Sequence, residues 1–439
     1  MFSRAKKHAG RNPVMYIYKT ENNEAGLGKG ELEELLLQSL EGRDLKKVLI
    51  IPPDFTRYYS NGGAITNFYY HTLMDRGCSV DILIAQGSHG ALSKELFAKM
   101  YGDIPYEKMI PHRWREDTVR IGEVPADYIR EITDGIWDDG EDLPVEVNRR
   151  LLDPSYDLIL SVGQVVPHEV IGMANHAKNI FVGVGGKEMI NKSHMIGAVF
   201  GMERVMGKDF SPVRKIFDYS LEHFLKEIPL IFVLTVTTAP HDEIITHAVM
   251  IGDERIALEE AIRQAQKHNL DFLDRPIKKC VVYMNPDEFH TTWVANKSVY
   301  RTRMAMADGG ELIVLAPGVV KFGEDPAQDE IIRKYGYAGR LKILELFKNN
   351  EDLLENMGTA AHLIHGSPDG RFTVTYAVKN ISRDEIESVH FQSASYDEIV
   401  QRYDPKKLQY GWNTMPDGEE IFFIPNPALG LWADKARFT

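Results

Sequence analysis

The chain is poor in cysteine, in basic charge and in long apolar runs, and each shortage excludes a class of protein. Its 439 residues include two cysteines, Cys78 and Cys280, too few for a disulfide framework or a thiolate zinc site. A net charge of −13 argues against a nucleic-acid footprint, because phosphate binding needs a local surplus of lysine and arginine. No apolar run approaches the roughly 18 residues that a membrane-spanning helix needs.

The remaining composition predicts a soluble protein with more than one domain. Hydrophobic residues make up 44% and charged residues 26% of a chain that is too long for one typical domain. The first residues, MFSRAKKHAGRNPVMY, are basic but lack the apolar core of a signal peptide. Together with the scarce cysteines, this predicts a cytoplasmic protein that binds neither nucleic acid nor membrane.

Strands and helices alternate in the first part of the chain. Short apolar runs at 46–51, 79–85 and 156–163 predict buried strands, and helical spacing follows at 62–77 and 91–102. This alternation predicts a doubly wound α/β sheet, in which ligands bind beyond the C-terminal ends of the strands.

A second α/β unit is predicted after the linker DRPIKK. Its strands are expected at 278–285, 310–318, 371–378 and 388–394, with a helix over TTWVANKSVYRTRMAMA. We therefore expect two α/β domains, 1–275 and 276–414, with the active site in the cleft between them. The apolar tail, about 415–439, is expected to pack back on the first domain.

Two familiar motifs fail in the stretch PHEVIGMANHAKNIFVGVGGKEMINKSH. A zincin needs a second histidine four residues after His168, where Gly172 stands. A P-loop fails at both ends, at Phe181 and Glu188. The glycines of this stretch could still let backbone N–H groups approach a phosphate, although an ordinary turn is the commoner role. These glycines are Gly183, Gly185 and Gly186.

Polar residues follow three of the predicted strands. Asp54 and Arg57 lie in PPDFTR, His89 lies in GSHG, and His168 ends VGQVVPH. If the strand ends share one edge of the sheet, these side chains converge. Histidine suits proton transfer near neutral pH, and two histidines can act on opposite faces of one carbon, as a racemase requires.

Lys178 and His194 have no role in that scheme by themselves. A lysine amine can form a covalent link, and a histidine can bind a metal. A single histidine makes a poor metal site, because transition metals usually draw three or four protein ligands. An organic cofactor that carries the metal would remove the objection. The open alternative is a zinc metallohydrolase that uses His89, His168 and His194.

The motifs PPDFTR and GSHG, with the spacing of His168, Lys178 and His194, resemble the nickel-dependent lactate racemase family of 2-hydroxyacid racemases and epimerases. The resemblance extends over most of the chain and includes Lys297 in the second domain. It implies a nickel-pincer nucleotide, a pyridinium-3-thioamide-5-thiocarboxylic acid mononucleotide that binds nickel. It also implies that enzymes of the host make the cofactor.

The resemblance also implies a role for each matched residue. Lys178 matches the lysine that tethers the cofactor covalently, and His194 matches the one protein ligand of nickel. His89 and His168 match the two acid/base histidines. The residues that match the substrate-binding positions of the family are Arg57, Lys297 and Asp54.

The sequence departs from the family near the substrate. The residues before the tether are ANHA, which adds His176, and Val294 stands where a glutamine is common. A family tryptophan is missing near Met357. Arg301 lies four residues after Lys297, on the same face if the segment is helical. We therefore expect His176 and Arg301 to bind a substrate larger or more polar than lactate, either a sugar acid or a dicarboxylate.

Three alternatives to this epimerase stay open from the sequence. Lactate racemase proper is one, the zinc metallohydrolase is another, and a non-catalytic nucleotide or cofactor carrier is the third. A carrier would not need paired histidines at strand ends. The sequence leaves the oligomeric state undetermined.

Overall fold

A computed structural model describes residues 16–21 and 23–438 of the chain. It divides into two compact units, neither of which is a single segment. Unit 1 comprises Met1–Ile190 and Gly207–Asn269, and unit 2 comprises Asn191–Met206 and Leu270–Thr439. The predicted boundary at 275 therefore lies within unit 2, and the short segment 191–206 belongs to unit 2 rather than to the N-terminal part.

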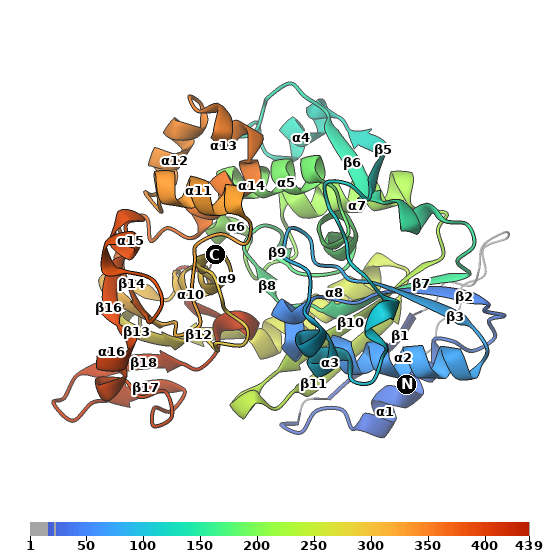
Figure 1. Cartoon of the computed structure of the whole chain (residues 1–439), viewed down its shortest axis with the longest axis horizontal. Helices are drawn as coiled ribbons and strands as arrows, with labels where there is room; N and C mark the ends of the chain where they lie inside the picture. The colour runs from blue at the N-terminus through green and yellow to red at the C-terminus, as the bar shows by residue number, and fades with distance from the viewer. Residues whose placement is uncertain (1–15, 22, 439) are drawn as a thin grey trace. The chain divides into compact units, whose positions relative to one another are not determined.

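Unit 1 is built on a seven-stranded sheet with strand order β1-β11-β10-β7-β2-β3-β4 (Figure 1). Strands β10, β7, β2, β3 and β4 run parallel, and β11 pairs antiparallel with both β10 and β1. The strand bounds are β1 Tyr16–Thr20, β2 Lys47–Ile51, β3 Ser79–Leu83, β4 Met109–Ile110, β7 Leu158–Gln164, β10 Leu230–Thr238 and β11 Ile245–Gly252. Two short antiparallel pairs complete the unit: β5 Thr118–Val124 with β6 Leu143–Asn148, and β8 Pro167–His168 with β9 Gly172–Met173.

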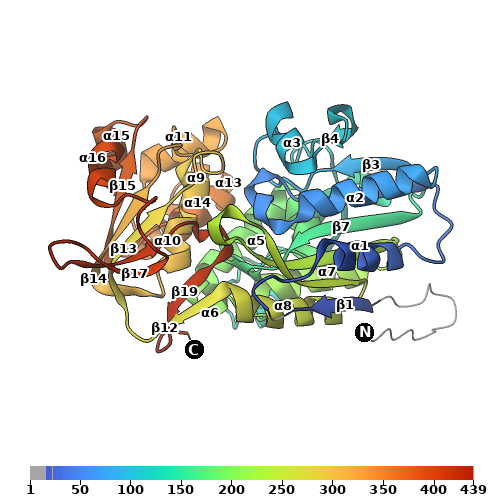
Figure 2. The ribbon, with the colours of Figure 1, turned by 90° about the horizontal axis from the view of Figure 1, so that it is seen from below.

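Helices cover the sheet because alternate strand residues are apolar on each face. Val48 and Ile50 of β2 join one core with Leu35 of α1 and Tyr69 of α2. Helices α1 and α2 lie side by side in Figure 2. The helix bounds are α1 Lys29–Gln38, α2 Gly62–Asp75, α3 Lys94–Tyr101, α4 Ala126–Ile132, α7 Pro212–Phe224 and α8 Arg255–Asn269, while α5 Lys187–Phe200 crosses the boundary between the units.

Unit 2 contains a six-stranded sheet with strand order β16-β15-β14-β13-β18-β17. All neighbouring strands run parallel except β17, which is antiparallel to β18. The strand bounds are β13 Ile277–Tyr283, β14 Met306–Leu315, β15 Phe372–Val378, β16 Gln392–Ser395, β17 Gly411–Thr414 and β18 Glu420–Ile424, and a separate parallel pair joins β12 Leu270–Leu273 with β19 Leu431–Asp434. The predicted α/β class is confirmed in both units.

The helices of unit 2 include α6, α9 to α16 and the larger part of α5. Their bounds are α6 Met202–Val205, α9 Thr292–Ala295, α10 Lys297–Thr302, α11 Pro326–Tyr335, α12 Arg340–Phe347, α13 Glu351–Glu355, α14 Met357–His365, α15 Arg383–Ser388 and α16 Tyr396–Arg402. The single helix predicted over TTWVANKSVYRTRMAMA is interrupted at Asn296, whose side chain accepts a hydrogen bond from the Tyr376 hydroxyl at 2.6 Å.

The C-terminal tail belongs to unit 2. It supplies β18 to the sheet of that unit, where Phe423 pairs with Val281 of β13. The reason is that a central parallel strand must be buried on both faces, and the apolar run EIFFI satisfies that need.

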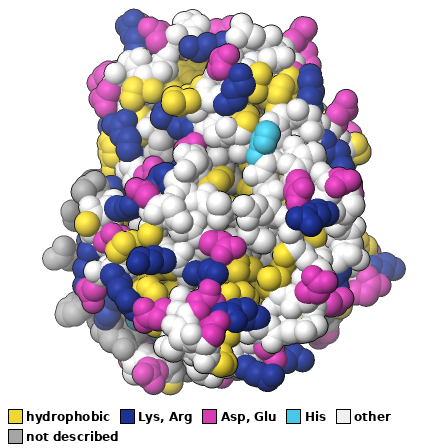
Figure 3. Space-filling model, turned by 90° about the vertical axis from the view of Figure 1, so that its left-hand side faces the viewer, with side chains coloured by type: hydrophobic (Ala, Val, Ile, Leu, Met, Phe, Trp, Pro, Cys, Tyr) yellow, Lys and Arg dark blue, Asp and Glu magenta, His cyan; other side chains and the backbone are white. Residues whose placement is uncertain are grey.

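The surface carries charges of both signs. On the face in Figure 3, lysine and arginine side chains alternate with acidic ones and with small apolar areas. Among the described residues, no helix is long and apolar enough to cross a membrane.

Candidate active site

Asp54 lies at the C-terminal end of β2 and begins the short 3-10 helix η1 (Phe55–Ser60). Its Oδ1 accepts hydrogen bonds from the backbone N–H of Thr56 at 3.2 Å and from the Thr56 hydroxyl at 2.6 Å. Its Oδ2 lies 2.5 Å from Nδ1 of His89. The carboxyl side chain is only 7% exposed, so little water screens this contact. Asp54 thus caps the short helix and orients His89.

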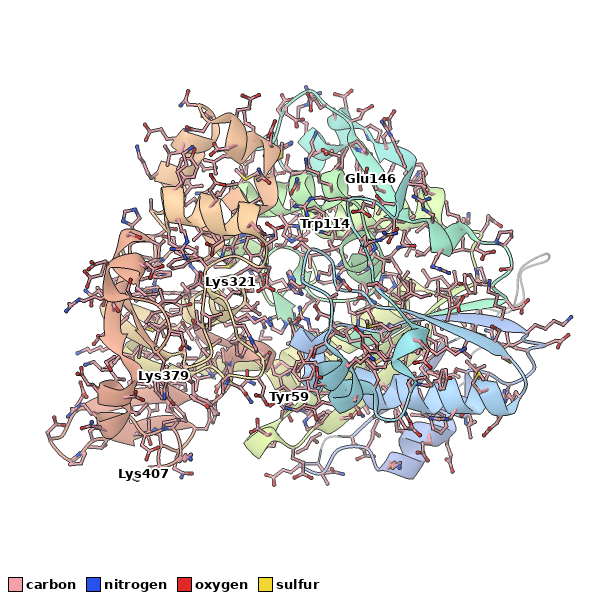
Figure 4. All side chains as sticks on the ribbon, viewed as in Figure 1. Tyr59, Trp114, Glu146, Lys321, Lys379 and Lys407 are labelled. Carbon is pink, nitrogen blue, oxygen red and sulfur yellow. The ribbon has the colours of Figure 1, made fainter. Side chains whose placement is uncertain are left out.

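Arg57 lies within η1, and β10 holds that helix in place. The hydroxyl of Thr237 donates to the Tyr59 carbonyl at 2.8 Å, and the Tyr59 hydroxyl donates to Asp242 at 2.7 Å (Figure 4). Nη1 of Arg57 is buried and has no hydrogen-bond acceptor within residues 16–21 and 23–438. Because buried donors are nearly always satisfied, this guanidinium is ready to bind an anionic ligand.

His89 lies in the loop that follows β3. Gly87, at φ +57°, turns this loop, and its N–H donates to the Gly183 carbonyl at 2.9 Å. The His89 side chain is 30% exposed. Since Nδ1 of His89 faces the Asp54 carboxylate, the neutral ring carries its proton there and leaves Nε2 free to accept one.

His168 follows β7 through the short strand β8, and it is 5% exposed. Its Nδ1 accepts a hydrogen bond from the backbone N–H of Val170 at 3.2 Å and lies 3.6 Å from the Glu169 carboxylate. The bond from Val170 assigns the proton of the neutral ring to Nε2, the opposite tautomer to that of His89.

Strands β7, β2 and β3 are parallel neighbours, so their C-terminal ends lie at one edge of the sheet. The predicted shared edge is therefore confirmed. Asp54 follows β2, His89 follows β3 and His168 follows β7. This edge is where sheets of this kind bind ligands.

Lys178 begins a buried π-helix, Asn179–Gly183, and its side chain is half-buried. The asparagine after it, Asn179, donates to the Ser161 hydroxyl of β7 at 2.9 Å, which fastens this helix to the sheet. Single π-helical turns occur often at functional sites. The lysine amine therefore extends from a rigid backbone only ten residues after His168.

The glycines after Lys178 are required by packing inside the protein. A Cβ atom at Gly185 would collide with the Phe181 carbonyl, and one at Gly186 would collide with Glu146 (Figure 4). The N–H of Gly186 donates to the Glu146 carbonyl at 3.3 Å, and that of Gly185 to the Val182 carbonyl at 3.4 Å. These two amides therefore have protein acceptors, as in an ordinary turn.

His176, which we predicted to contact substrate, lies in the interior of unit 1. It is 2% exposed, and its ring lies on Phe232 with centroids 3.9 Å apart. Neither ring nitrogen has a hydrogen-bond partner in the described part of the chain. Burial, aided by the positive charges of Arg214 and Arg255, holds the pKa of His176 well below its usual value, so the ring is neutral.

Lys297 and Arg301 lie one turn apart on α10 of unit 2 and are both buried. Nζ of Lys297 lies 3.9 Å from the Glu288 carboxylate and 5.4 Å from the centre of the Phe289 ring. The Arg301 guanidinium donates to the Gly430 carbonyl at 3.1 Å. Arg301 is only 1% exposed, so it contributes to the packing of unit 2.

Sequence reasoning missed Glu288, whose side chain is 3% exposed. It follows β13 as Asp54 follows β2, so its position after a strand was the available signal. Asn426 donates to its second oxygen at 3.3 Å.

His194 is half-buried on the part of α5 that belongs to unit 2, with Nδ1 3.5 Å from the Ser193 hydroxyl. A second histidine pair, His362 and His365, lies on α14 and was also missed. His362 stacks on Trp293 at 4.2 Å, and burial, with weaker effects of His365 and His194, lowers its pKa to about 3. No three histidine, cysteine or acidic side chains among the described residues are grouped to hold a metal.

Three comparisons place the chain among known proteins. Residues 31–206 match a family described as lactate racemase N-terminal domain. A crystal structure of a Thermotoga maritima protein is 25% identical, with a TM-score of 0.81 over 94% of this chain and 100% of that one. The lactate racemase apoprotein from Thermoanaerobacterium thermosaccharolyticum is 16% identical, with a TM-score of 0.65 over 91% of this chain and 92% of that one. No curated protein matches.

Proposed function

Because residues 31–206 match the family described as lactate racemase N-terminal domain, we propose that this chain interconverts the two configurations at C2 of a 2-hydroxy acid. The reaction is racemisation or epimerisation, with the nickel-pincer nucleotide as cofactor. The contact between Asp54 and His89, at a sheet edge that His168 also reaches, carries the proposal. An oriented base at that edge suits removal of a proton from a bound hydroxyl group.

The donor atoms of the chain fit a metal that arrives with its own ligands. His194 is one imidazole, and no three-residue metal site forms in the described chain, so nickel would need further donors from the cofactor. Lys178 would hold that group covalently through its amine, and His194 would supply the protein ligand. When bound, the cofactor supplies the acceptor that takes the C2 hydride and returns it.

The two histidines would divide the proton chemistry. Nε2 of His89 takes the proton of the substrate hydroxyl, and Asp54 stabilises the imidazolium that forms. Nε2 of His168 bears a proton in the neutral ring, so it can donate a hydrogen bond to the carbonyl oxygen of the 2-keto acid. When C2 has regained its hydrogen on the other face, the imidazolium of His89 returns its proton to that oxygen and becomes neutral again.

Two cations would bind the substrate carboxylate. The buried Nη1 of Arg57 lacks an acceptor in the described chain, and a carboxylate would satisfy it. Lys297 would supply the second positive charge and stabilise the negative charge that develops on oxygen.

The substrate is proposed to be larger and more polar than lactate. The reason is Glu288, rather than the contacts expected from His176 and Arg301. His176 and Arg301 are buried in packing, whereas Glu288 lies beside Lys297. A buried carboxylate accepts hydrogen bonds from hydroxyl groups and repels a second carboxylate. This favours a polyhydroxy acid over a dicarboxylate.

The experiment is to co-express the chain with enzymes that synthesise the cofactor and to assay single enantiomers of lactate, malate, 2-hydroxyglutarate and gluconate by chiral chromatography. We expect epimerisation at C2 to be fastest with gluconate, and a mass adduct on Lys178. Protein made without those enzymes should be inactive. Full activity in that preparation, with nickel absent, would refute the proposed mechanism.

A further inference from the structure

A second segment of unit 1 binds the backbone between His168 and Lys178. Four of the five carbonyl oxygens of residues 171–175 accept hydrogen bonds from residues 207–214. The bonds are Ser211 Oγ to Ile171 at 2.9 Å, Gly207 N–H to Gly172 at 2.9 Å, Arg214 Nη2 to Met173 at 2.7 Å and Arg214 Nη1 to Asn175 at 3.5 Å. We name these three donor residues, Gly207, Ser211 and Arg214, the carbonyl clamp.

The clamp is built into the start of α7. The Ser211 hydroxyl accepts a hydrogen bond from the Arg214 N–H at 2.9 Å, which caps the helix, and it donates its own proton to Ile171. Arg214 is 2% exposed. Burial lowers the pKa of Arg214 to about 10, which still leaves it charged at neutral pH.

Acidic side chains compensate the charge of Arg214. Asp218 lies one helical turn after Arg214, and its carboxylate is 3.3 Å from Nη1 of Arg255. The other terminal nitrogen of Arg255, Nη2, lies 2.5 Å from the Asp209 carboxylate. An apolar residue at position 214 would avoid the desolvation of a buried guanidinium. What Arg214 provides instead is donors of fixed geometry, aimed at backbone oxygens.

The clamped backbone has an unfavourable conformation just before Lys178. Asn175 and His176 both have left-handed backbone angles, with φ +68° and φ +57°. Non-glycine residues hold such angles only where surrounding contacts impose them. The bond from Arg214 to the Asn175 carbonyl lies at this turn, three residues before Lys178, which begins the π-helix.

We propose that Ser211 and Arg214 are positioning residues, which fix the turn that presents Lys178 and keep it in register with His168. The functional part of this inference rests on the proposed function. The geometric part requires only that the turn depend on the clamp. Arg214 has a second effect at the same turn, because its charge adds to burial in lowering the pKa of His176.

The first measurement is amide hydrogen exchange of the cofactor-free protein, followed for peptides that cover residues 171–180. In Arg214→Met we expect exchange there to rise about tenfold, since a charge-assisted hydrogen bond is lost, while peptides from β7 and β10 stay protected. Lys215→Met is the matched control, because Lys215 is the exposed neighbour on the same helix. Unchanged exchange at 171–180 in a folded Arg214→Met protein would overturn the clamp.

Ser211→Gly provides a second variant if Arg214→Met does not fold. Glycine removes the donor to Ile171 but is tolerated as a helix cap, so a local rise in exchange without a fall in helix protection supports the clamp. Protection lost evenly over α7 and residues 171–180 would contradict it.

The second measurement uses cofactor-loaded protein. We expect about tenfold less Lys178 adduct in Arg214→Met, and a lower kcat with little change in KM, because the clamp does not touch the substrate. Arg214→Lys should recover part of both. Normal adduct and kcat together with faster exchange would overturn the positioning role. Wild-type protein with neither adduct nor activity would refute the proposed function and leave the exchange result to decide the clamp.

Discussion

Each unit places a buried carboxylate just after a parallel strand and pairs it with a nitrogen base, but the two pairs differ in tightness. In unit 1, Asp54 lies 2.5 Å from His89 and also caps a helix. In unit 2, Glu288 lies 3.9 Å from Lys297. The close pair is suited to orienting one ring, whereas the longer separation of the second pair is that of an ion pair without a direct hydrogen bond. Under the proposed function, the same placement after a strand would serve proton transfer in one unit and substrate selection in the other.

The largest effect is expected at Lys178, the proposed tether of the cofactor, which belongs to neither pair. Lys178→Ala should abolish the adduct and reduce activity below detection, because no other amine begins the π-helix. Lys187→Ala, at the start of α5, is the control and should keep both. The measurement is intact mass followed by the racemisation assay. Adduct retained in Lys178→Ala would assign the tether to another residue.

Asp54→Asn tests the close pair. An amide can hold the ring in the wrong tautomer, so kcat should fall by about 10² to 10³, with the adduct on Lys178 unchanged. Steady-state kinetics with the best substrate of the panel would measure it. A KM effect alone would show that Asp54 binds substrate and does not orient His89.

Acid should destabilise unit 2 through His362. Its pKa is 6.5 when unfolded and about 3 when folded, so the unfolded state binds the proton more readily. The contribution of His362 to the free energy of unfolding is fully present above pH 6.5. It falls as the pH drops towards 3, by about 2 kcal/mol at pH 5.

The matched variant for that effect is His362→Phe. Phenylalanine can keep the stack on Trp293, and Tyr337 keeps its contact with the Thr292 hydroxyl at 2.9 Å. Urea unfolding at pH 7 and pH 5 should show the pH difference shrink in this variant but persist in His290→Gln, an exposed control. Equal pH dependence in all three proteins would mean that His362 does not titrate as described.

The smallest effect is expected from the pair of Glu288 and Lys297. Glu288→Gln removes the repulsion of a second carboxylate, so kcat/KM for malate relative to gluconate should rise roughly fivefold. Thermal denaturation of the cofactor-free variant, with and without malate, gives a reading that does not depend on catalysis. A ratio that stays constant would show that Glu288 lies away from the substrate.

The sequence predicted features that depend on local pattern. Apolar runs identified β2, β3 and β7, and parallel sheets place such strand ends at one edge, so Asp54 and His89 could be expected near each other. The contact between them depends on β2 and β3 being neighbours, which no short motif encodes.

Longer-range packing explains what the sequence did not predict. His176 is buried because Phe232 of β10 lies against it, and that strand is more than fifty residues away in the chain. Arg301 donates to the carbonyl of Gly430, which is more than a hundred residues away in the chain. Charge and spacing near Lys297 suggested a substrate contact, but only tertiary structure distinguishes a binding side chain from a packing one.

The division of the chain into two interleaved units affects how the protein folds during synthesis. Met202 and Met206 leave the ribosome early, yet they pack with Tyr300, Met304 and Leu431, which are translated later. A nascent chain that ends at Asn269 therefore holds all of unit 1 and an orphaned apolar segment. During translation this segment stays exposed to chaperones and prone to aggregation until the rest of unit 2 has been synthesised. If the N-terminal half were expressed alone, this apolar segment would stay exposed, because its packing partners would be missing.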